Sequence, residues 1–415
     1  MIAELISVGT ELLMGQVLNT DSQFMAQELA PLGINVYHML TVGDNPGRLK
    51  EAILKALERA DLVILSGGLG PTGDDLTKKV VADAFSLPME RSKEAEEALY
   101  ERFSALGREM TPNNLQQADF PKGSLILENP NGTAPGCITE SGSKAAILLP
   151  GPPRELFPMF KNKVIPYLEA KSGCRLFSRE VRIFGMGESS VEYQLKDLIE
   201  NQNNPTIAPY AKVGEVTLRV TARCEQLQEG AALVAPVIKE ISERLGDIVY
   251  STEGVELSGV CAALLEKQDA TLAVAESCSG GLLASALVDV PGSSAFFLEG
   301  AVTYSDAAKL RRLGVSPATL RKFGAVSAEC AKEMALGMRK TSGADYALST
   351  TGIAGPAGGT KEKPVGLVFV GLASSSGVYV GRLLLNGDRK RIREITVLNA
   401  LDLLRRELMG LKQRV

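Results

Sequence analysis

The residues best suited to chemistry lie in one stretch, from Ala273 to Lys309. Its apolar start predicts a short buried strand, which runs into a serine- and glycine-rich turn containing Ser277 and Ser279 and then into a helical pattern. Because the first N–H groups of a helix lack partners within the helix, such a turn suits a phosphate or a developing oxyanion. Tyr304 and Lys309 follow at a second strand-to-helix connection. The alternative to a catalytic or anion-binding role is a structural one, in which Ser279 is an ordinary helix cap.

The single histidine, His38, limits the possible mechanisms. A Ser-His-Asp or Cys-His mechanism would need this one residue, which is far from the serine turn in sequence, and a site with several histidines is impossible. The six cysteines are scattered singly without a CxxC pair, which favours reduced thiols in a cytoplasm over a disulfide framework or a zinc site. We therefore expect the base near Ser279 to be a lysine, a tyrosine or a carboxylate.

The composition is typical of a soluble globular protein, with 45% hydrophobic and 23% charged residues. A length of 415 residues favours two or three domains. The net charge of −4 makes a dedicated nucleic-acid surface unlikely. No apolar run reaches the ~18 residues of a membrane span, and the first residues lack the basic region of a signal peptide. We expect a cytoplasmic protein.

The N-terminal third alternates strand and helix patterns. Strands are expected at Ala3–Val8, Ile34–Val42 and Asp61–Leu65, with a helix that starts at Asp21 and a second helix at Arg48–Ala60 between them. This order predicts an α/β fold with a right-handed, parallel, doubly wound sheet. Ligands of such sheets bind beyond the carboxyl ends of the strands.

A glycine-rich loop, Ser66–Thr77, lies at that edge of the expected sheet. Its glycines let the backbone approach a phosphate closely. Asp74 and Asp75 would repel a phosphate, so a phosphate site here needs a divalent cation such as Mg²⁺. The alternative is that one of these aspartates caps the next helix. The loops at Asn129–Gly136 and Pro150–Glu155 are candidates for the same crevice.

The rest of the chain divides into a small middle unit and a second α/β region. Strands at Arg179–Phe184 and Glu215–Ala222 and a helix at Ala231–Leu245 indicate an α+β unit. Near the C-terminus, Thr351 follows another apolar strand, and Arg389 opens the last helix. A cation in the first turn opposes the helix dipole, which favours an anionic ligand there.

Four N-terminal segments, Gly9–Gln16, Ser66–Thr77, Asn129–Gly136 and Leu149–Glu155, resemble the molybdopterin-binding-like N-terminal domain of the CinA family. The resemblance implies a domain over residues 1–170 that is related to molybdopterin adenylyltransferases and has Mg²⁺-dependent ADP-ribose pyrophosphatase activity. By position, the nucleotide-binding residues would be Gly67, Gly68, Asp75, Asn131, Thr133, Gly151 and Pro152. The metal ligands would come from Asp74 and Asp75, and the motif does not say which of them binds.

Four C-terminal segments, Ala275–Gly281, Thr303–Lys309, Gly352–Pro356 and Gly387–Arg389, resemble the CinA C-terminal domain of the nicotinamide mononucleotide (NMN) amidohydrolase type. The resemblance implies a domain over residues 254–415 that deamidates NMN to nicotinate mononucleotide and ammonia without a cofactor.

In this mechanism Ser279 attacks the carboxamide, Lys309 takes its proton and Tyr304 helps to relay that proton. Ser277 remains the alternative nucleophile. Turn amides near Gly280 would stabilise the oxyanion. The expected substrate-binding residues are Gly280, Gly281, Thr351, Gly355 and Arg389.

The middle region, residues 171–253, resembles the KH-type module of the same family. We do not infer RNA binding from it, because fold analogy is weak support for function and no clear basic stripe is present. An interdomain or subunit contact is expected instead. The family further implies a homodimer whose small-molecule ligands are NMN and ADP-ribose. Two alternatives remain: a binding scaffold linked to competence and DNA damage, or a nucleotide phosphohydrolase active only at the N-terminal site.

Overall fold

The computed structural model describes residues 1–415 except 106, 108, 172, 174 and 415. The chain forms two compact units, Met1–Phe177 with Ala222–Ala231, and Ser178–Thr221 with Ala232–Val415. Among the described residues, no helix is both long enough and apolar enough to cross a membrane.

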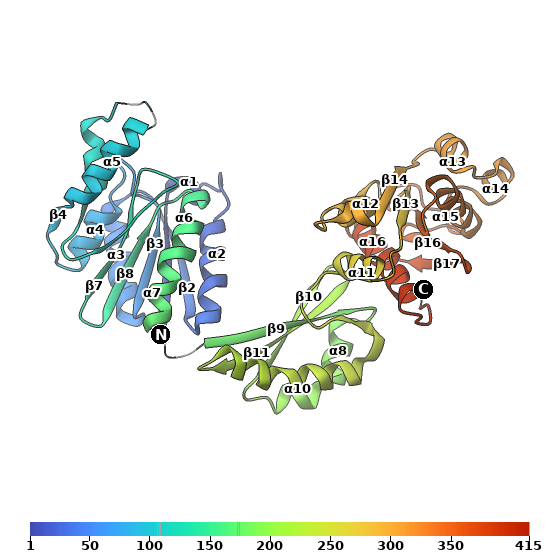
Figure 1. The fold of residues 1–415 in the computed structure, drawn as a ribbon, viewed down its shortest axis with the longest axis horizontal. Coiled ribbons are helices and arrows are strands. Elements are labelled where there is room, and N and C mark those ends of the chain that lie inside the picture. Colours follow the sequence, from blue (N-terminus) through green and yellow to red (C-terminus); the bar gives the residue numbers. More distant parts are fainter. Residues whose placement is uncertain (106, 108, 172, 174, 415) are drawn as a thin grey trace. The chain divides into compact units, whose positions relative to one another are not determined.

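The first unit is built on a six-stranded sheet with the order β2-β1-β3-β8-β7-β6 (Figure 1). The first four strands in this order are parallel, and β7 and β6 run antiparallel to their neighbours. The strand bounds are β1 Ile2–Val8, β2 Asn35–Val42, β3 Leu62–Ser66, β6 Leu125–Leu127, β7 Gly136–Ser141 and β8 Lys144–Leu149. The parallel α/β core expected from the sequence is therefore confirmed.

Helices cover both faces of this sheet. Ile6 of β1 packs with residues of α3 and α4, whereas Leu5 packs with residues of α2 and α6. Alternate residues of a strand thus pack into the cores on opposite faces of the sheet. Because both faces are buried, the sequences of these strands are continuous apolar runs. The helix bounds are α1 Thr10–Leu13, α2 Thr20–Leu29, α3 Pro46–Arg59, α4 Thr77–Ala84, α5 Lys93–Ala105, α6 Pro153–Met159 and α7 Ile165–Lys171. A small hairpin of β4 (Met89–Arg91) and β5 (Asp119–Pro121) completes the unit.

A four-stranded sheet with the order β10-β11-β9-β12 forms the middle of the chain. Its strands are β9 Arg175–Phe184, β10 Thr206–Lys212, β11 Glu215–Cys224 and β12 Val249–Ser251. The accompanying helices are α8 Glu188–Gln194, α9 Lys196–Glu200 and α10 Leu227–Leu245. This is the expected α+β module, although α10 begins one turn before the predicted helix.

The C-terminal region has a five-stranded sheet with the order β14-β13-β15-β16-β17. Strands β13 (Leu272–Glu276), β14 (Phe297–Val302) and β15 (Tyr346–Gly352) are parallel, and β16 (Leu367–Ser374) and β17 (Gly377–Leu384) are antiparallel. One core contains residues of α11 (Leu257–Lys267), α12 (Leu282–Val288) and α16 (Arg389–Leu408). The opposite core contains residues of α13 (Asp306–Leu313) and α15 (Ala328–Ser342), with α14 (Pro317–Phe323) beside them.

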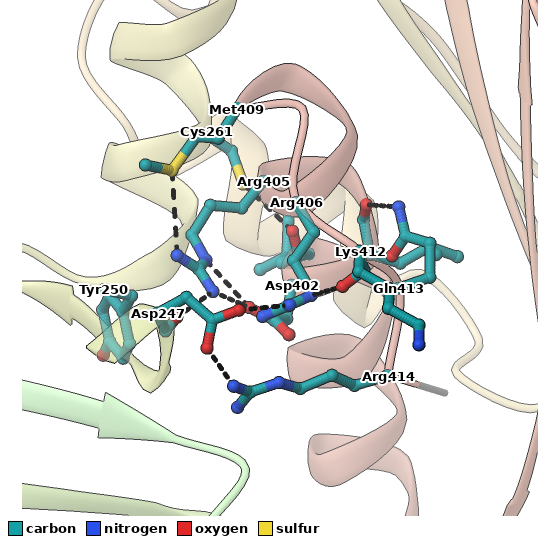
Figure 2. Close-up of polar contacts among 12 residues, drawn as sticks. Asp247, Tyr250, Cys261, Asp402, Arg405, Arg406, Met409, Lys412, Gln413 and Arg414 are labelled. Atoms are coloured by element: carbon teal, nitrogen blue, oxygen red, sulfur yellow. Dashed lines mark hydrogen bonds and ion pairs between the residues drawn. The ribbon is translucent and has the colours of Figure 1, made fainter. Parts of the chain in front are cut away.

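A buried charge cluster joins the end of α16 to the segment between α10 and β12 (Figure 2). Arg405 and Arg406 are each 1% exposed. Arg405 Nη2 donates to the Asp247 carbonyl oxygen at 2.9 Å and Arg406 Nη2 to Asp247 Oδ2 at 2.5 Å, while Arg414 pairs with the same carboxylate. Arg405 also pairs with Asp402. Asp247 therefore neutralises cations that would be costly to bury alone.

Candidate functional site

The serine turn follows β13 and leads into α12, as the sequence predicts. The Ser277 N–H donates to the Thr350 carbonyl oxygen at 2.9 Å, which fixes the start of the turn beside β15. Gly280 and Gly281 have φ values of 62° and 96°, a region that disfavours side chains. The glycines therefore let the chain reverse sharply between strand and helix.

Lys309 lies in the first turns of α13 with its side chain fully buried. Its Nζ is 3.0 Å from Ser277 Oγ, 2.8 Å from the Thr303 carbonyl oxygen and 3.3 Å from the Tyr304 carbonyl oxygen. Burial lowers the pKa of Lys309. The amine thus touches a serine hydroxyl in an environment that favours its neutral form.

Ser279 lies in a different environment from Ser277. It is fully buried, and its Oγ is 2.6 Å from Thr350 Oγ1. Its carbonyl oxygen accepts two hydrogen bonds from Arg393, at 2.7 and 3.2 Å. The Ser279 hydroxyl therefore faces Thr350 of β15, while its carbonyl oxygen is held by Arg393 of α16. The expected contact of Ser279 with Lys309 is wrong: the lysine contacts Ser277.

A cavity of about 210 Å³ opens beside this pair. Ser277, Lys309, Tyr304, Thr351 and Arg389 line it, together with Cys278, Ala325, Val326, Gly352 and Ala354. Four sequence motifs that are far apart in the chain thus meet at one edge of the sheet. Lys309 and Arg389 are the basic residues among the lining residues that the structure describes.

Tyr304 and Arg389 contact each other at this cavity. Arg389 Nη2 donates to the Tyr304 hydroxyl at 3.1 Å, and Nη1 donates to the Gly355 carbonyl oxygen at 2.8 Å. Tyr304 is 62% exposed, and Lys309 is bonded to its carbonyl oxygen, not to its hydroxyl. The proton relay expected for the phenol therefore has no contact with Lys309 here; Tyr304 holds Arg389 instead.

Thr351 shapes the cavity wall through a loop that the sequence analysis missed. Thr351 Oγ1 donates to the Ala325 carbonyl oxygen at 2.7 Å. Lys363 Nζ donates to the Val326 carbonyl oxygen at 2.7 Å and also to that of Phe323. The loop that contains Ala325 and Val326 carries no sequence motif. It contributes backbone carbonyl groups and small apolar side chains to the wall, and these give no signal in the sequence.

The glycines of the turn do not line the cavity. The Gly281 N–H donates to Glu276 Oε2 at 2.9 Å, and Gly280 lies against the Arg393 guanidinium. The expected oxyanion and substrate contacts of Gly280 and Gly281 therefore stay a prediction that this cavity does not support, since neither glycine is among its lining residues. The sequence analysis missed Glu276, because it ends β13 six residues before α12 begins and so does not stand at an N-cap position.

A second cavity, of about 590 Å³, lies at the carboxyl ends of β1, β3 and β8 in the first unit. Its lining includes the predicted residues Gly67, Gly68, Asp74, Asp75, Thr133, Gly151 and Pro152. Gly67 has φ 94°, and a Cβ there would lie 2.3 Å from the Val8 carbonyl oxygen. Asn131 is not among the lining residues; its N–H donates to Asn129 Oδ1 within the neighbouring turn.

This N-terminal cavity is strongly acidic. Its lining carries the carboxylates of Glu11, Asp21, Asp44, Asp74, Asp75 and Glu155, and no basic side chain among the described residues. An anionic ligand therefore needs a cation beside it.

The carboxylates of the N-terminal cavity are suitable ligands for such a cation, but they do not form a full set of protein ligands around one point. Asp75 accepts hydrogen bonds from Thr72, whereas Asp21 Oδ1 is buried without a partner and burial raises the pKa of Asp21 to about 6. The described residues contain no cluster of three or more His, Cys, Asp or Glu side chains arranged to hold a metal ion. Mg²⁺ commonly binds through one or two carboxylates plus waters and ligand phosphates, so oxygen-rich walls of this kind suit it.

Comparison with family models divides the chain into three matched segments. Residues 4–170 match a probable molybdopterin binding domain, residues 178–251 match the damage-inducible protein CinA KH domain, and residues 255–408 match the CinA C-terminal domain. The two cavities lie within the first and the third of these segments.

Relatives match the chain over nearly its whole length. A putative competence-damage inducible protein of Acetivibrio thermocellus is 51% identical over 410 residues, which cover 99% of each chain. A CinA-like protein of Kosmotoga olearia is 49% identical, with the same coverage. The crystal structure of a competence/damage inducible protein from Agrobacterium tumefaciens is 40% identical over 36% of this chain and 94% of its own, with a TM-score of 0.35. The chain belongs to the CinA family.

Proposed function

We propose that the C-terminal domain is an amidohydrolase that converts NMN and water to nicotinate mononucleotide and ammonia. The observation that carries this proposal is the 3.0 Å contact between Lys309 Nζ and Ser277 Oγ at the wall of a cavity. A serine hydroxyl becomes a nucleophile when an adjacent base takes its proton. We assign Ser277 as that nucleophile and Lys309 as that base.

The partners of Lys309 support this assignment. A neutral amine has two N–H donors and one lone pair, and two of the three Nζ partners are carbonyl oxygens, which only accept. With both N–H groups donated to the carbonyls of Thr303 and Tyr304, the lone pair faces the Ser277 hydroxyl. The lowered pKa of Lys309 favours this neutral state.

The reaction then has two stages. Ser277 Oγ bonds to the carboxamide carbon while its proton moves to Lys309. Lys309 returns that proton to the amide nitrogen as the C–N bond breaks, which releases ammonia and leaves an ester on Ser277. Water, deprotonated by Lys309, attacks this ester, and the serine leaves with the same proton, which regenerates the enzyme.

The cavity suits the nicotinamide end of the substrate. Ligand pockets usually measure about 300–1,000 Å³, so a volume of about 210 Å³ holds the base while the ribose phosphate extends outward. Arg389 lies at the cavity wall with Gly355 and Tyr304 as partners, and a guanidinium is suited to bind phosphate. Thr351, another lining residue, donates to the Ala325 carbonyl oxygen and so holds that part of the wall in place.

Ammonia release from NMN by the full-length chain in EDTA tests this proposal. The expected result is steady release that falls on the order of 10³-fold or more in Lys309→Met. Methionine is similar in length and uncharged, so it preserves the packing of a buried side chain. Near-native release in this variant, or none from the wild type, would reject the proposed reaction.

The N-terminal cavity favours a second activity, Mg²⁺-dependent hydrolysis of ADP-ribose to AMP and ribose 5-phosphate. The supporting observation is a cavity of about 590 Å³ that carries six carboxylates and no basic side chain among the described residues. When bound, Mg²⁺ would neutralise the pyrophosphate and make it more electrophilic. Asp74 and Asp75 are the proposed ligands, and the unpartnered Asp21 is a further carboxylate at the same wall. AMP formation with Mg²⁺, and its loss in EDTA, is the test.

The binding-scaffold interpretation remains the competing account, since several relatives are named as competence-damage inducible proteins. It predicts neither ammonia nor AMP. We further propose a cytoplasmic homodimer, which light scattering at several protein concentrations checks.

A further inference from the structure

Glu276 is a buried carboxylate that the reaction described above does not use. It ends β13 and is fully buried. Oε2 accepts the N–H groups of Gly281 at 2.9 Å and Leu283 at 3.1 Å, and Oε1 accepts that of Ala284 at 2.8 Å. These N–H groups open α12 and have no partner within the helix.

The serine turn is held by other groups at its start and centre. The Ser277 N–H is bonded to the Thr350 carbonyl oxygen, and the Ser279 hydroxyl lies 2.6 Å from Thr350 Oγ1. Arg393 binds the Ser279 carbonyl oxygen. The contacts of Glu276 hold the far end of the turn, where it becomes α12. The whole turn is therefore fixed against β15, α16 and its own following helix.

We propose that Glu276 is a positioning residue for the amidohydrolase reaction proposed above, on which this inference rests. By tying the end of the turn to the end of β13, it keeps Ser277 Oγ at its contact with Lys309 Nζ. Its two carboxylate oxygens are bonded to amides that open α12, whereas Lys309 Nζ is bonded to other groups, so the two side chains share no hydrogen bond.

The charge placement matters because a carboxylate beside Lys309 would favour the protonated amine. Asp306, in the first turn of α13, acts on Lys309 in this way and raises its pKa, but the effect of burial, which lowers the pKa, is larger. Glu276 is adjacent to Ser277 in sequence, but its carboxylate oxygens accept hydrogen bonds from the amides that open α12. The turn thus gains an anchor whose carboxylate is bonded to the amides of α12 and not to Lys309.

Glu276→Gln tests the proposal with the full-length chain. The amide retains one acceptor oxygen but turns an NH₂ group toward a backbone donor, so the turn loses part of its anchor. The kcat for ammonia release should fall on the order of 10- to 100-fold. The KM for NMN should stay within about 2-fold, and the acid limb of the kcat profile should not move, since neither the cavity cations nor Lys309 is altered.

Glu333→Gln is the matched control. Glu333 Oε2 accepts the Ser316 N–H at 2.7 Å and Oε1 accepts the Thr319 hydroxyl at 2.5 Å. It therefore caps α14 in the same domain, and it is absent from the cavity wall. The kcat of Glu333→Gln for ammonia release should match that of the wild type. Its thermal stability should fall by about as much as the thermal stability of Glu276→Gln.

Hydrogen exchange at the amides of Gly281, Leu283 and Ala284 separates this inference from the proposed function, because it needs no substrate. Exchange should be faster in Glu276→Gln and unchanged in Glu333→Gln. Unchanged exchange in Glu276→Gln, or faster exchange with kcat within about 2-fold of the wild type, overturns the positioning role. A displaced acid limb does so too, because it would show that Glu276 acts on Lys309 through charge. A wild type that releases no ammonia rejects the proposed function alone.

Discussion

The two cavities of this chain differ in charge and size. The N-terminal cavity measures about 590 Å³ and is lined by carboxylates without a basic side chain among the described residues. The C-terminal cavity measures about 210 Å³, and Lys309 and Arg389 line it. The first needs an added cation before it can hold a phosphate, whereas the second is lined by the Arg389 guanidinium and by the proposed nucleophile. This difference supports the proposal of metal-dependent chemistry at the N-terminal cavity and metal-free chemistry at the C-terminal cavity.

Removal of metal should give the largest contrast between the two cavities. EDTA should abolish AMP formation from ADP-ribose and leave ammonia release from NMN within about 2-fold, because only the acidic cavity needs a cation to hold phosphate. Both products are measured in one preparation, and added Mg²⁺ should restore AMP. Loss of ammonia release in EDTA would contradict the proposal that the reaction at the C-terminal cavity needs no metal ion.

Arg389→Ala should affect only the C-terminal cavity. The variant loses the cation proposed for the substrate phosphate, so the KM for NMN should rise on the order of 10- to 100-fold with a smaller change in kcat. AMP formation from ADP-ribose serves as the internal control and should not change. A kcat loss at unchanged KM would contradict phosphate binding by Arg389.

The pH dependence of ammonia release should reflect the lowered pKa of Lys309 at the C-terminal cavity. Lys309 must be neutral to accept a proton, so the kcat for ammonia release should rise with pH and level off below the ordinary lysine pKa of about 10.4. Its lowered pKa also means that the unfolded chain binds more protons between the two pKa values, so the stability of the second unit should rise with pH in that window. Lys309→Met should remove this stability slope, as followed by thermal unfolding at several pH values.

Asp247→Asn should produce the smallest change in activity and a measurable loss of stability. The variant removes the charge that Arg406 and Arg414 share, so the unfolding free energy of the second unit should fall by about 2 kcal/mol. AMP formation at the N-terminal cavity should stay constant. Asp197→Asn, which breaks an exposed pair with Arg244, should cost at most about 1 kcal/mol. Equal losses in the two variants would contradict the role given to the cluster in Figure 2.

The sequence predicts the N-terminal cavity well because its signals are local. Glycines and polar residues that end parallel strands must gather at one edge of the sheet, so Gly67, Thr133 and Gly151 all reach the cavity. Asn131 does not, because its turn is closed by a hydrogen bond to Asn129. That bond depends on loop geometry, which strand and helix patterns do not specify.

The C-terminal cavity shows the limit of the same reasoning. The motifs predict that a serine turn meets Lys309, and this meeting is present. Two serines that are two residues apart in a turn point in different directions, and pattern alone cannot choose between Ser277 and Ser279. The choice depends on Thr350 and Arg393, which bind Ser279 from distant parts of the chain.

We propose that Ser277, and not Ser279, is the nucleophile beside Lys309. Ammonia release from NMN by Ser277→Ala and Ser279→Ala, measured side by side in EDTA, distinguishes the two serines. We predict a loss on the order of 10³-fold or more for Ser277→Ala and retention of activity within about 10-fold for Ser279→Ala, which loses only a buried hydrogen bond. The opposite order of losses would contradict the account.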